Sequence, residues 1–300
     1  MIQRKLYILF ILLYAIFCIT GCISADKTDI VEIIVFDAGK ADAILITTKT
    51  HAVMIDAGGR EFGDFLVAEL SSRDITELDY LIITHFDKDH VGGAAAVINN
   101  VDVKTVVVPN YRRDTRDYRN FSQAKIDNNI VATVLENQNL LEFALDNASF
   151  IIYPSDLDFV EYIIRQEDDE DEYDEKEFED NEQPNVNNYS LVTSLSHGDN
   201  DFLFTGDAKA RRIREILSIE TIIETNFDFL KVPHHGRLNR RSIEFITTIN
   251  PRYAVITCSP EKPADKDVVE ALKEIGTGTF FTSNGMVSIT SDGKNITIRQ

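Results

Sequence analysis

The feature that most constrains the fold is a cluster of metal-binding side chains that directly follows an apolar run. Residues 81–84 (Leu-Ile-Ile-Thr) predict a β-strand, and Val91-Gly-Gly after the cluster predicts a tight turn into a helix. Between them, within six residues, lie four side chains of the types that bind divalent cations: His85, Asp87, Asp89 and His90. Pairs this close on one loop can face two neighbouring cations. A chance surface cluster is the alternative, and it predicts no further ligands elsewhere.

Further ligand-type residues do occur, each at the end of another predicted strand. Asp207 closes the segment Phe204-Thr-Gly-Asp, and His234 and His235 follow Leu230-Lys-Val-Pro. A lone Thr-Gly-Asp or His-His is a weak signal, but all three elements in this order form a strong one. The sequence therefore predicts one metal centre assembled from the ends of distant strands.

Strand-like and helix-like segments are interleaved along both halves of the chain. Short β-rich runs predict strands at 31–36, 43–47, 51–55, 80–84, 103–108, 150–153, 190–195, 202–205, 253–257, 279–282 and 287–290. Helical patterns fall at 61–72, 91–99, 207–218, 241–249 and 265–275. This order is typical of a layered α/β arrangement with two sheets and outer helices.

Together the ligand-bearing segments resemble the metallo-β-lactamase superfamily, and within it the hydrolase domain of the ComEC competence proteins and their free-standing relatives. The resemblance spans the chain from about Val31 to the C-terminus. Residues 36–43 (Phe-Asp-Ala-Gly-Lys-Ala-Asp-Ala) are similar to that family's Asp-Val-Gly-Gln-Gly-Asp opening, and 54–58 (Met-Ile-Asp-Ala-Gly) to the strand that follows it. Residues 152–154 and 187–192 also fall in the family's order. The resemblance implies a four-layered αββα sandwich with the metals at one edge.

The resemblance also implies how two divalent cations, Zn²⁺ or Mn²⁺, would be held. The implied ligands are His85 and Asp87 for the first cation, Asp89 and His90 for the second, Asp207 bridging both, and His235 completing the second site, with its neighbour His234 as the alternative. Because a carboxylate, Asp87, stands where most of the superfamily has a second histidine, Mn²⁺ becomes a realistic rival to Zn²⁺. The superfamily's histidine before the Asp207 strand has no clear counterpart, and Asn187 or Asn188 lies nearest.

Two neighbouring cations lower the pKa of a shared water, generate hydroxide near neutral pH and stabilise charge that develops on substrate oxygens. Asp89 is placed to orient that hydroxide, so we take it as the candidate catalytic residue. Phosphodiester hydrolysis, including nuclease activity, fits this chemistry best. The same hydroxide attacks the carbonyl carbon of an ester, lactone or amide, and a lipoprotein that keeps the fold as a non-catalytic binding module is a third hypothesis.

The surroundings of the predicted centre depart from the family's pattern. Lys40-Ala replaces Gln-Gly of the opening motif, and Arg237 stands where the family usually has Ser after His-His-Gly. Together with Asn188, these two residues are our candidates for substrate binding. Arginines at 112–119, in a predicted loop after Val108, and at 237–241 are further candidates for a phosphate cradle, with an ordinary solvated basic face as the alternative.

The N-terminus has the layout of an export signal. Arg4 and Lys5 precede an apolar stretch from Leu6 to Ile19 that is short for a membrane span. Ile19-Thr-Gly-Cys22 resembles the lipobox at which bacterial lipoproteins are cleaved and acylated. We therefore expect residues 1–21 to be a signal peptide and Cys22 to anchor residues 22–300, as one hydrolase domain, outside the cytoplasmic membrane; an uncleaved membrane helix is the alternative. The sequence indicates no protein partner.

The net charge of -20 would repel polyanions at long range, which argues against a broad nucleic-acid-binding surface. The charge is uneven, however. Twelve Asp and Glu against the single Lys176 lie between Glu167 and Glu182, so about half of it is local. Such a run cannot bury apolar surface, and we predict a disordered or solvated insertion at 167–183. A Ca²⁺ site is disfavoured, because an Asp/Asn ladder with a central Gly is missing.

Overall fold

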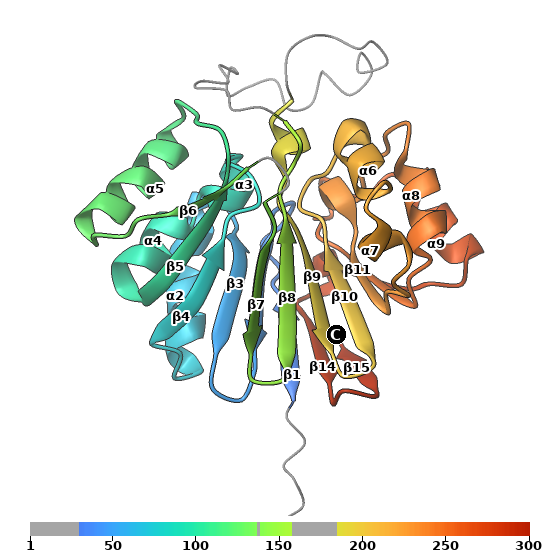
Figure 1. The fold of residues 1–300 in the computed structure, drawn as a ribbon, viewed down its shortest axis with the longest axis horizontal. Helices are drawn as coiled ribbons and strands as arrows, with labels where there is room; N and C mark the ends of the chain where they lie inside the picture. Colours follow the sequence, from blue (N-terminus) through green and yellow to red (C-terminus); the bar gives the residue numbers. More distant parts are fainter. Residues whose placement is uncertain (1–29, 137–138, 158–184) are drawn as a thin grey trace, which may run out of the picture.

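The structure is a computed structural model that describes residues 30–136, 139–157 and 185–300. Two β-sheets pack against each other between two groups of helices, which gives four layers (Figure 1). The predicted αββα sandwich is thus confirmed. Within these ranges no helix combines the length and apolarity needed to cross a membrane. The predicted signal peptide, Cys22 and the acidic segment 167–183 lie outside the described residues.

The first sheet has eight strands, which are antiparallel on one side of β3 and parallel on the other. Its spatial order is β15 (Ile296–Arg299), β14 (Val287–Ser291), β1 (Val31–Val35), β2 (Ala43–Thr47), β3 (Ala52–Ala57), β4 (Glu77–Ile82), β5 (Asp102–Pro109) and β6 (Thr133–Leu135). From β3 to β6 the strands run parallel.

The second sheet has seven strands and the same mixed character. Its spatial order is β13 (Gly278–Phe281), β12 (Tyr253–Ile256), β11 (Phe229–Lys231), β10 (Asn200–Phe204), β9 (Val192–His197), β8 (Ala148–Tyr153) and β7 (Leu141–Leu145). The strands from β10 to β13 run parallel. Strands β6, β7 and β15 were not predicted from the sequence, since they are short or half-exposed and carry a weak apolar signal.

Helices cover the outer face of each sheet, the first group on the left of Figure 1 and the second on the right. Along the first half of the chain lie η1 (Arg60–Phe62), α2 (Gly63–Ser72), α3 (Lys88–Val91), α4 (Ala94–Asn100) and α5 (Arg116–Asp127). The second half contributes η2 (Val186–Tyr189), α6 (Ala210–Ile216), α7 (Glu220–Ile223), η3 (Pro233–Gly236), α8 (Ser242–Ile249), α9 (Lys266–Glu274) and η4 (Thr282–Asn284).

Central strands such as β1 are apolar on both faces, because each face meets a different layer. Val31, Ile33 and Val35 join the core between the two sheets, whereas Ile34 and Phe36 join the core under the helices. Successive side chains of a strand point to opposite faces, so a continuous apolar run is what a doubly covered strand requires. This explains why these strands were readable from the sequence.

Two glycines shape the chain beside the site. The predicted helix at 91–99 is interrupted, because α3 ends at Val91 and α4 begins at Ala94. A Cβ on Gly92 would lie 2.3 Å from the Lys88 carbonyl oxygen, and one on Gly93 would lie 2.2 Å from that of Ala57. Only glycine permits this approach, which packs α3 closely against the end of β3.

Candidate metal centre

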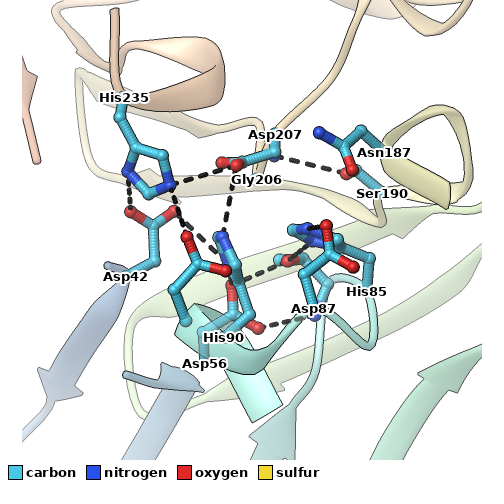
Figure 2. Close-up of polar contacts among 12 residues, drawn as sticks. Asp42, Asp56, His85, Asp87, His90, Asn187, Ser190, Gly206, Asp207 and His235 are labelled. Carbon is cyan, nitrogen blue, oxygen red and sulfur yellow. Dashed lines mark hydrogen bonds and ion pairs between the residues drawn. The ribbon is translucent and has the colours of Figure 1, made fainter. Parts of the chain in front are cut away.

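The candidate site lies at the edge where the parallel strands of both sheets end. Asp56 is the penultimate residue of β3, and His85 follows β4. Asp207 and His235 follow β10 and β11 of the other sheet. Parallel strands bring their carboxyl ends to one edge, which is where α/β folds place their sites. Side chains from both sheets therefore converge, as Figure 2 shows.

Four of the predicted ligands form one compact group. Asp89, His90, Asp207 and His235 each offer one ligand atom, and these atoms all lie within 4.8 Å of one another. The Asp207 Oδ2 lies 3.3 Å from the His90 Nε2 and 3.0 Å from the His235 Nε2, between the two rings. The His235 Nε2 is also 3.3 Å from an Asp89 oxygen. These are the residues that the resemblance assigns to the second cation and to the bridge.

The two residues predicted for the first cation lie beside this group. The ring centroid of His85 is 4.0 Å from that of His90, and its Nε2 is 3.6 Å from the Asp87 Oδ2. Asn187, one of the two residues nearest to the missing histidine, is buried, and its Oδ1 has no hydrogen-bond partner among the described residues. It precedes Ser190, whose hydroxyl accepts the Asp207 backbone N–H.

Hydrogen bonds to Asp56 fix the tautomers of two histidines. One Asp56 oxygen accepts from the Nδ1 of His90 at 2.8 Å and from the hydroxyl of Thr84 at 2.6 Å. Because the only hydroxyl proton of Thr84 goes to Asp56, its oxygen must accept from the His85 Nδ1, 3.0 Å away. Both rings therefore carry a proton on Nδ1, and each Nε2 is free to bind a cation.

A second relay orients His235 in the same way. The Thr257 hydroxyl donates to Asp42 at 2.6 Å, so its oxygen accepts from the His235 Nδ1 at 2.9 Å. Asp42 lies in the loop between β1 and β2, on the opposite sheet from Thr257, so this relay also connects the two sheets at the site.

The three Nε2 atoms provide a test of whether the residues fit a metal. The Nε2 atoms of His85, His90 and His235 are all buried, and none makes a hydrogen bond among the described residues. Buried polar groups without partners are costly and rare in proteins. Three converging imidazole nitrogens beside carboxylates form a ligand set suited to divalent transition metals. The residues present thus fit the predicted metal centre.

Two buried cations also belong to this network. The guanidinium of Arg113 pairs with Asp87, and the ammonium of Lys231 pairs with Asp42 and lies 3.5 Å from the Asp207 Oδ1. For Arg113, the alternative of an ordinary solvated basic face is therefore wrong. Its side chain is buried at 6% exposure and holds a candidate ligand.

The charges of this network leave room for cations. Among the ion pairs of the described residues, five carboxylates (Asp42, Asp56, Asp87, Asp89 and Asp207) share two lysine or arginine partners, Arg113 and Lys231. With neutral imidazoles, the network therefore carries three net negative charges. An uncompensated buried charge is strongly unfavourable, so the network must bind protons or metal cations.

Without metal, this negative charge is met by protons on the imidazoles. Burial alone would lower the pKa of His90, but the carboxylates of Asp207 and Asp56 outweigh it and raise that pKa well above the usual range. The pKa of His235 is likewise lowered by burial and raised by Asp207, with a net increase. For Asp89, burial would raise the pKa, yet His90 and His235 hold it well below its ordinary value.

These pKa shifts predict how pH affects metal binding. A raised imidazole pKa stabilises the metal-free protein below about pH 6.5, and that stabilisation is lost as the pH rises through the raised values. Metal must displace the same protons, so its affinity increases with pH. We expect the gap in Tm between metal-loaded and chelated protein to widen from pH 6.5 upward, as thermal unfolding at several pH values would measure. A gap that stays constant or narrows would contradict this.

The histidine pair occupies a strained turn. His234, His235 and Gly236 all have positive φ angles, of 49°, 54° and 76°. This left-handed region costs a residue with a side chain about 1–3 kcal/mol, and such strain gathers at functional sites. His235 points into the four-residue group, while the His234 ring centre lies 6.2 Å away from that of His235. Burial holds the pKa of His234 well below its usual value, so the ring is neutral.

The predicted substrate-binding residues lie outside the four-residue group. The Asn188 side chain accepts the Arg212 backbone N–H at 3.2 Å, and Arg237 pairs with Asp265 at 3.3 Å. Lys40 is half-buried, and its charge acts on His234. The predicted loop after Val108 is also partly wrong, because its later arginines lie on α5, whose first turn is capped by Thr115.

Sequence reasoning missed the functional importance of several residues, namely Asp42, Asp56, Thr84, Thr257 and Lys231. A usable signal existed for two of them. Asp56 and Lys231 are charged residues inside apolar strands, Met54-Ile-Asp-Ala and Phe229-Leu-Lys-Val. A charged residue in such a position is buried, and buried charges need partners.

Comparison with known proteins agrees with this geometry. The model of the Metallo-beta-lactamase superfamily matches residues 37–258. ComE operon protein 3 of Bacillus subtilis is 25% identical over 254 residues, which cover 79% of this chain and 29% of that protein. Recombination protein 2 of Haemophilus influenzae is 22% identical over 231 residues, which cover 76% of this chain and 24% of that protein. The chain thus spans less than a third of the length of these curated relatives.

Solved structures show the same fold. Tm1679, a metal-dependent hydrolase of the beta-lactamase superfamily, aligns with a TM-score of 0.53 and 11% identity, covering 85% of this chain and 97% of its own. The metallo-beta-lactamase fold protein YhfI from Bacillus subtilis aligns with a TM-score of 0.50 and 10% identity, covering 85% and 98%.

Proposed function

The chain belongs to the metallo-beta-lactamase superfamily, and from this premise we propose that it is a two-metal phosphodiesterase that acts outside the cytoplasmic membrane. The observation that carries the proposal is a set of three buried imidazole Nε2 atoms, each with its Nδ1 engaged and no hydrogen bond of its own among the described residues. Those of His90 and His235 face the Asp207 carboxylate, and that of His85 faces Asp87 beside them. Zn²⁺ and Mn²⁺ both suit this mixture of nitrogen and oxygen ligands.

The charge of the network supports two cations and an anionic substrate. With three net negative charges, one divalent cation would leave the centre negative, and it would repel a phosphodiester. Two would leave it with one positive charge, which attracts an anion. Bound there, two cations would lower the pKa of a water molecule and stabilise the charge that develops on phosphoryl oxygens.

The chain's own residues would prepare this reaction in three ways. Asp56 holds the His90 imidazole in one tautomer by a direct hydrogen bond. Asp42 does the same for His235 through the hydroxyl of Thr257. Asp207 offers Oδ2 between two rings. Asp89 stays ionised because neighbouring imidazoles hold the pKa of its carboxyl far below its ordinary value, so it can accept a hydrogen bond from the attacking water and orient it.

One relative adds weak support for the substrate class. The name Recombination protein 2 points to nucleic acids, which have phosphodiester backbones. This chain covers 24% of that protein. A nucleic-acid substrate would have to approach a chain with a net charge of -20, so short or single-stranded substrates fit better than a long duplex.

The proposal is tested by metal analysis together with a substrate panel. The purified chain should carry close to two Zn²⁺ or Mn²⁺ per molecule, and it should hydrolyse bis(p-nitrophenyl) phosphate and nucleic acids. Preferential cleavage of lactones, esters or amides would contradict the phosphodiesterase and show that the same centre hydrolyses carbonyl substrates. A well-folded protein without bound metal after growth with both ions would favour the non-catalytic binding module.

We also propose that the protein is a lipoprotein of the bacterial cell envelope, anchored through Cys22. The motif Ile19-Thr-Gly-Cys22 supports this. Strand β1 begins at Val31, at the end of the sheet opposite to the candidate centre, so an anchor at Cys22 would join the folded domain at the end away from that centre (Figure 1).

Replacing Cys22 by alanine should block acylation and release the protein from the membrane fraction. Mass spectrometry of the mature N-terminus, beside fractionation of wild-type and variant cells, measures this. Cys258 offers the matched control, since it is buried and should be dispensable for anchoring. An unmodified Cys22 in membrane-associated wild-type protein would contradict the anchor.

A further inference from the structure

Lys231 lies wholly inside the protein, directly beneath the candidate metal centre. Its side chain has 0% exposure, at the last residue of β11 and four positions before His235. Lysine is among the residues that are almost never fully buried unless paired, so the position calls for an explanation. Among the described residues its ammonium contacts three oxygen atoms: a carboxylate oxygen of Asp42, one of Asp207, and the backbone carbonyl of Gly206.

The ammonium pairs with one member of a second group of residues that could hold a metal. Apart from the four-residue group, Asp42, Asp56 and His90 also offer ligand atoms within 4.8 Å of one another. In this second group, however, the His90 Nδ1 already donates to Asp56, and Asp42 pairs with the Lys231 Nζ. A protonated Nδ1 is no metal ligand, and a paired carboxylate is already satisfied.

The same ammonium contacts one of the two Asp207 oxygens and leaves the other to the imidazoles. Its Nζ lies 3.5 Å from Oδ1 of Asp207 and donates to the carbonyl oxygen of Gly206 at 3.0 Å. The Oδ2 faces the Nε2 atoms of His90 and His235. One carboxylate oxygen thus faces the Lys231 ammonium. The other faces the rings of His90 and His235 (Figure 2).

We propose that Lys231 is a resident cation of the centre: by pairing with Asp42 it satisfies one carboxylate of the group Asp42, Asp56 and His90, which could otherwise hold a metal, and it positions Asp207 so that a single oxygen faces the two metal positions. A lysine in this place fixes one positive charge and limits how many divalent cations the carboxylates can recruit. The inference rests on the proposed metal centre, but it does not depend on the substrate class.

Replacing Lys231 by alanine tests this in the full-length chain. Without metal, the variant should unfold at a temperature at least ~5 °C lower than wild type, because Asp42 and Asp207 lose a shared partner. Ammonium chloride should restore much of this loss, whereas tetramethylammonium chloride at the same ionic strength should not, since it is too large for the vacated space. Lys104→Ala is the matched control, because Lys104 also contacts two carboxylates, but at an exposed position.

Equilibrium dialysis measures how many Mn²⁺ ions each chain binds. If Lys231 had a merely structural role, its removal would lower this number. The Lys231→Ala variant should bind at least as many Mn²⁺ ions per chain as wild type, with ammonium competing for the additional capacity. Fewer Mn²⁺ ions than wild type, or equal effects of ammonium and tetramethylammonium on its unfolding temperature, would overturn the proposal. Wild type that binds no Mn²⁺ or Zn²⁺ would instead refute the proposed function, and the unfolding measurement would still decide the role of Lys231.

If Lys231→Ala does not fold, a compensating pair keeps the proposal testable. Lys231→Met leaves Asp42 buried without its cation, and adding Asp42→Asn removes the uncompensated charge. We expect the double variant to unfold at a higher temperature than Lys231→Met, or to fold where the single variant does not. If Asp42→Asn destabilises the Lys231→Met protein as much as it destabilises wild type, the proposed pairing is wrong.

Discussion

Asp207→Ala is expected to abolish hydrolysis and to strip metal from both positions of the centre at once. One oxygen of Asp207 lies between two imidazole nitrogens, 3.3 Å from His90 and 3.0 Å from His235. Its removal withdraws a ligand that both cations would share. Losing the paired cations removes several kcal/mol of transition-state stabilisation, so the rate should fall at least ~10³-fold. Metal content per chain, measured beside the rate of bis(p-nitrophenyl) phosphate hydrolysis, tests both parts.

Two further variants make this result specific. Asp201→Ala removes a carboxylate from β10, the strand that precedes Asp207, at the end away from the centre. It should therefore leave metal content unchanged. His85→Ala should empty mainly the first position, because His85 lies outside the four-residue group. An Asp207→Ala protein that is folded and retains wild-type metal content would contradict the bridging role.

The candidate ligands were predictable because each is encoded locally. His85, Asp87, Asp89 and His90 share one loop, and Asp207 and His235 each follow an apolar strand. Strand and helix positions were readable for the same reason, since doubly covered strands give continuous apolar runs. Which loops meet was supplied by the family resemblance and not by any local pattern.

The supporting residues were missed because their partners lie far away in the sequence. Thr257 donates to Asp42 across 215 positions, and Asp56 accepts from His90 across 34. No periodicity or spacing rule joins such pairs. Burial of Asp42, which lies in a loop, was equally hidden, since charged side chains are usually assigned to the surface.

The error over Arg113 has a related cause. A cluster of arginines in a polar segment resembles a solvated basic face, and the sequence gives no sign that one of them turns inward. In the structure Arg112 and Asp114 are exposed, but Arg113 between them is buried and reaches Asp87. The guanidinium donates to the Phe86 carbonyl oxygen and to Asp87, and the Tyr111 hydroxyl accepts the Phe86 backbone N–H. These bonds hold the loop that carries four candidate ligands.

Asp56→Asn is expected to weaken metal binding about 10–100-fold, although Asp56 itself faces no metal position. The carboxylate accepts three hydrogen bonds, from the backbone N–H and hydroxyl of Thr84 and from the His90 Nδ1. Asparagine keeps the shape and tolerates the left-handed backbone of this residue, whose φ is 55°. It has only one acceptor oxygen, however, so its NH₂ group must face one of those donors.

Both orientations of the asparagine harm the centre. If the NH₂ group faces the Thr84 backbone N–H, two donors oppose each other in a buried site, which costs about 1–3 kcal/mol or more. If it faces His90, the ring must accept on Nδ1 and carry its proton on Nε2, where it can no longer bind a cation. Asp79→Asn is the matched control, because Asp79 also accepts a backbone N–H and contacts a histidine, His51, away from the centre. Thermal unfolding should show that both variants lose stability. Calorimetric titration with Zn²⁺ should show that only Asp56→Asn loses metal affinity. Equal metal affinity in the two variants would mean that Asp56 merely supports the fold.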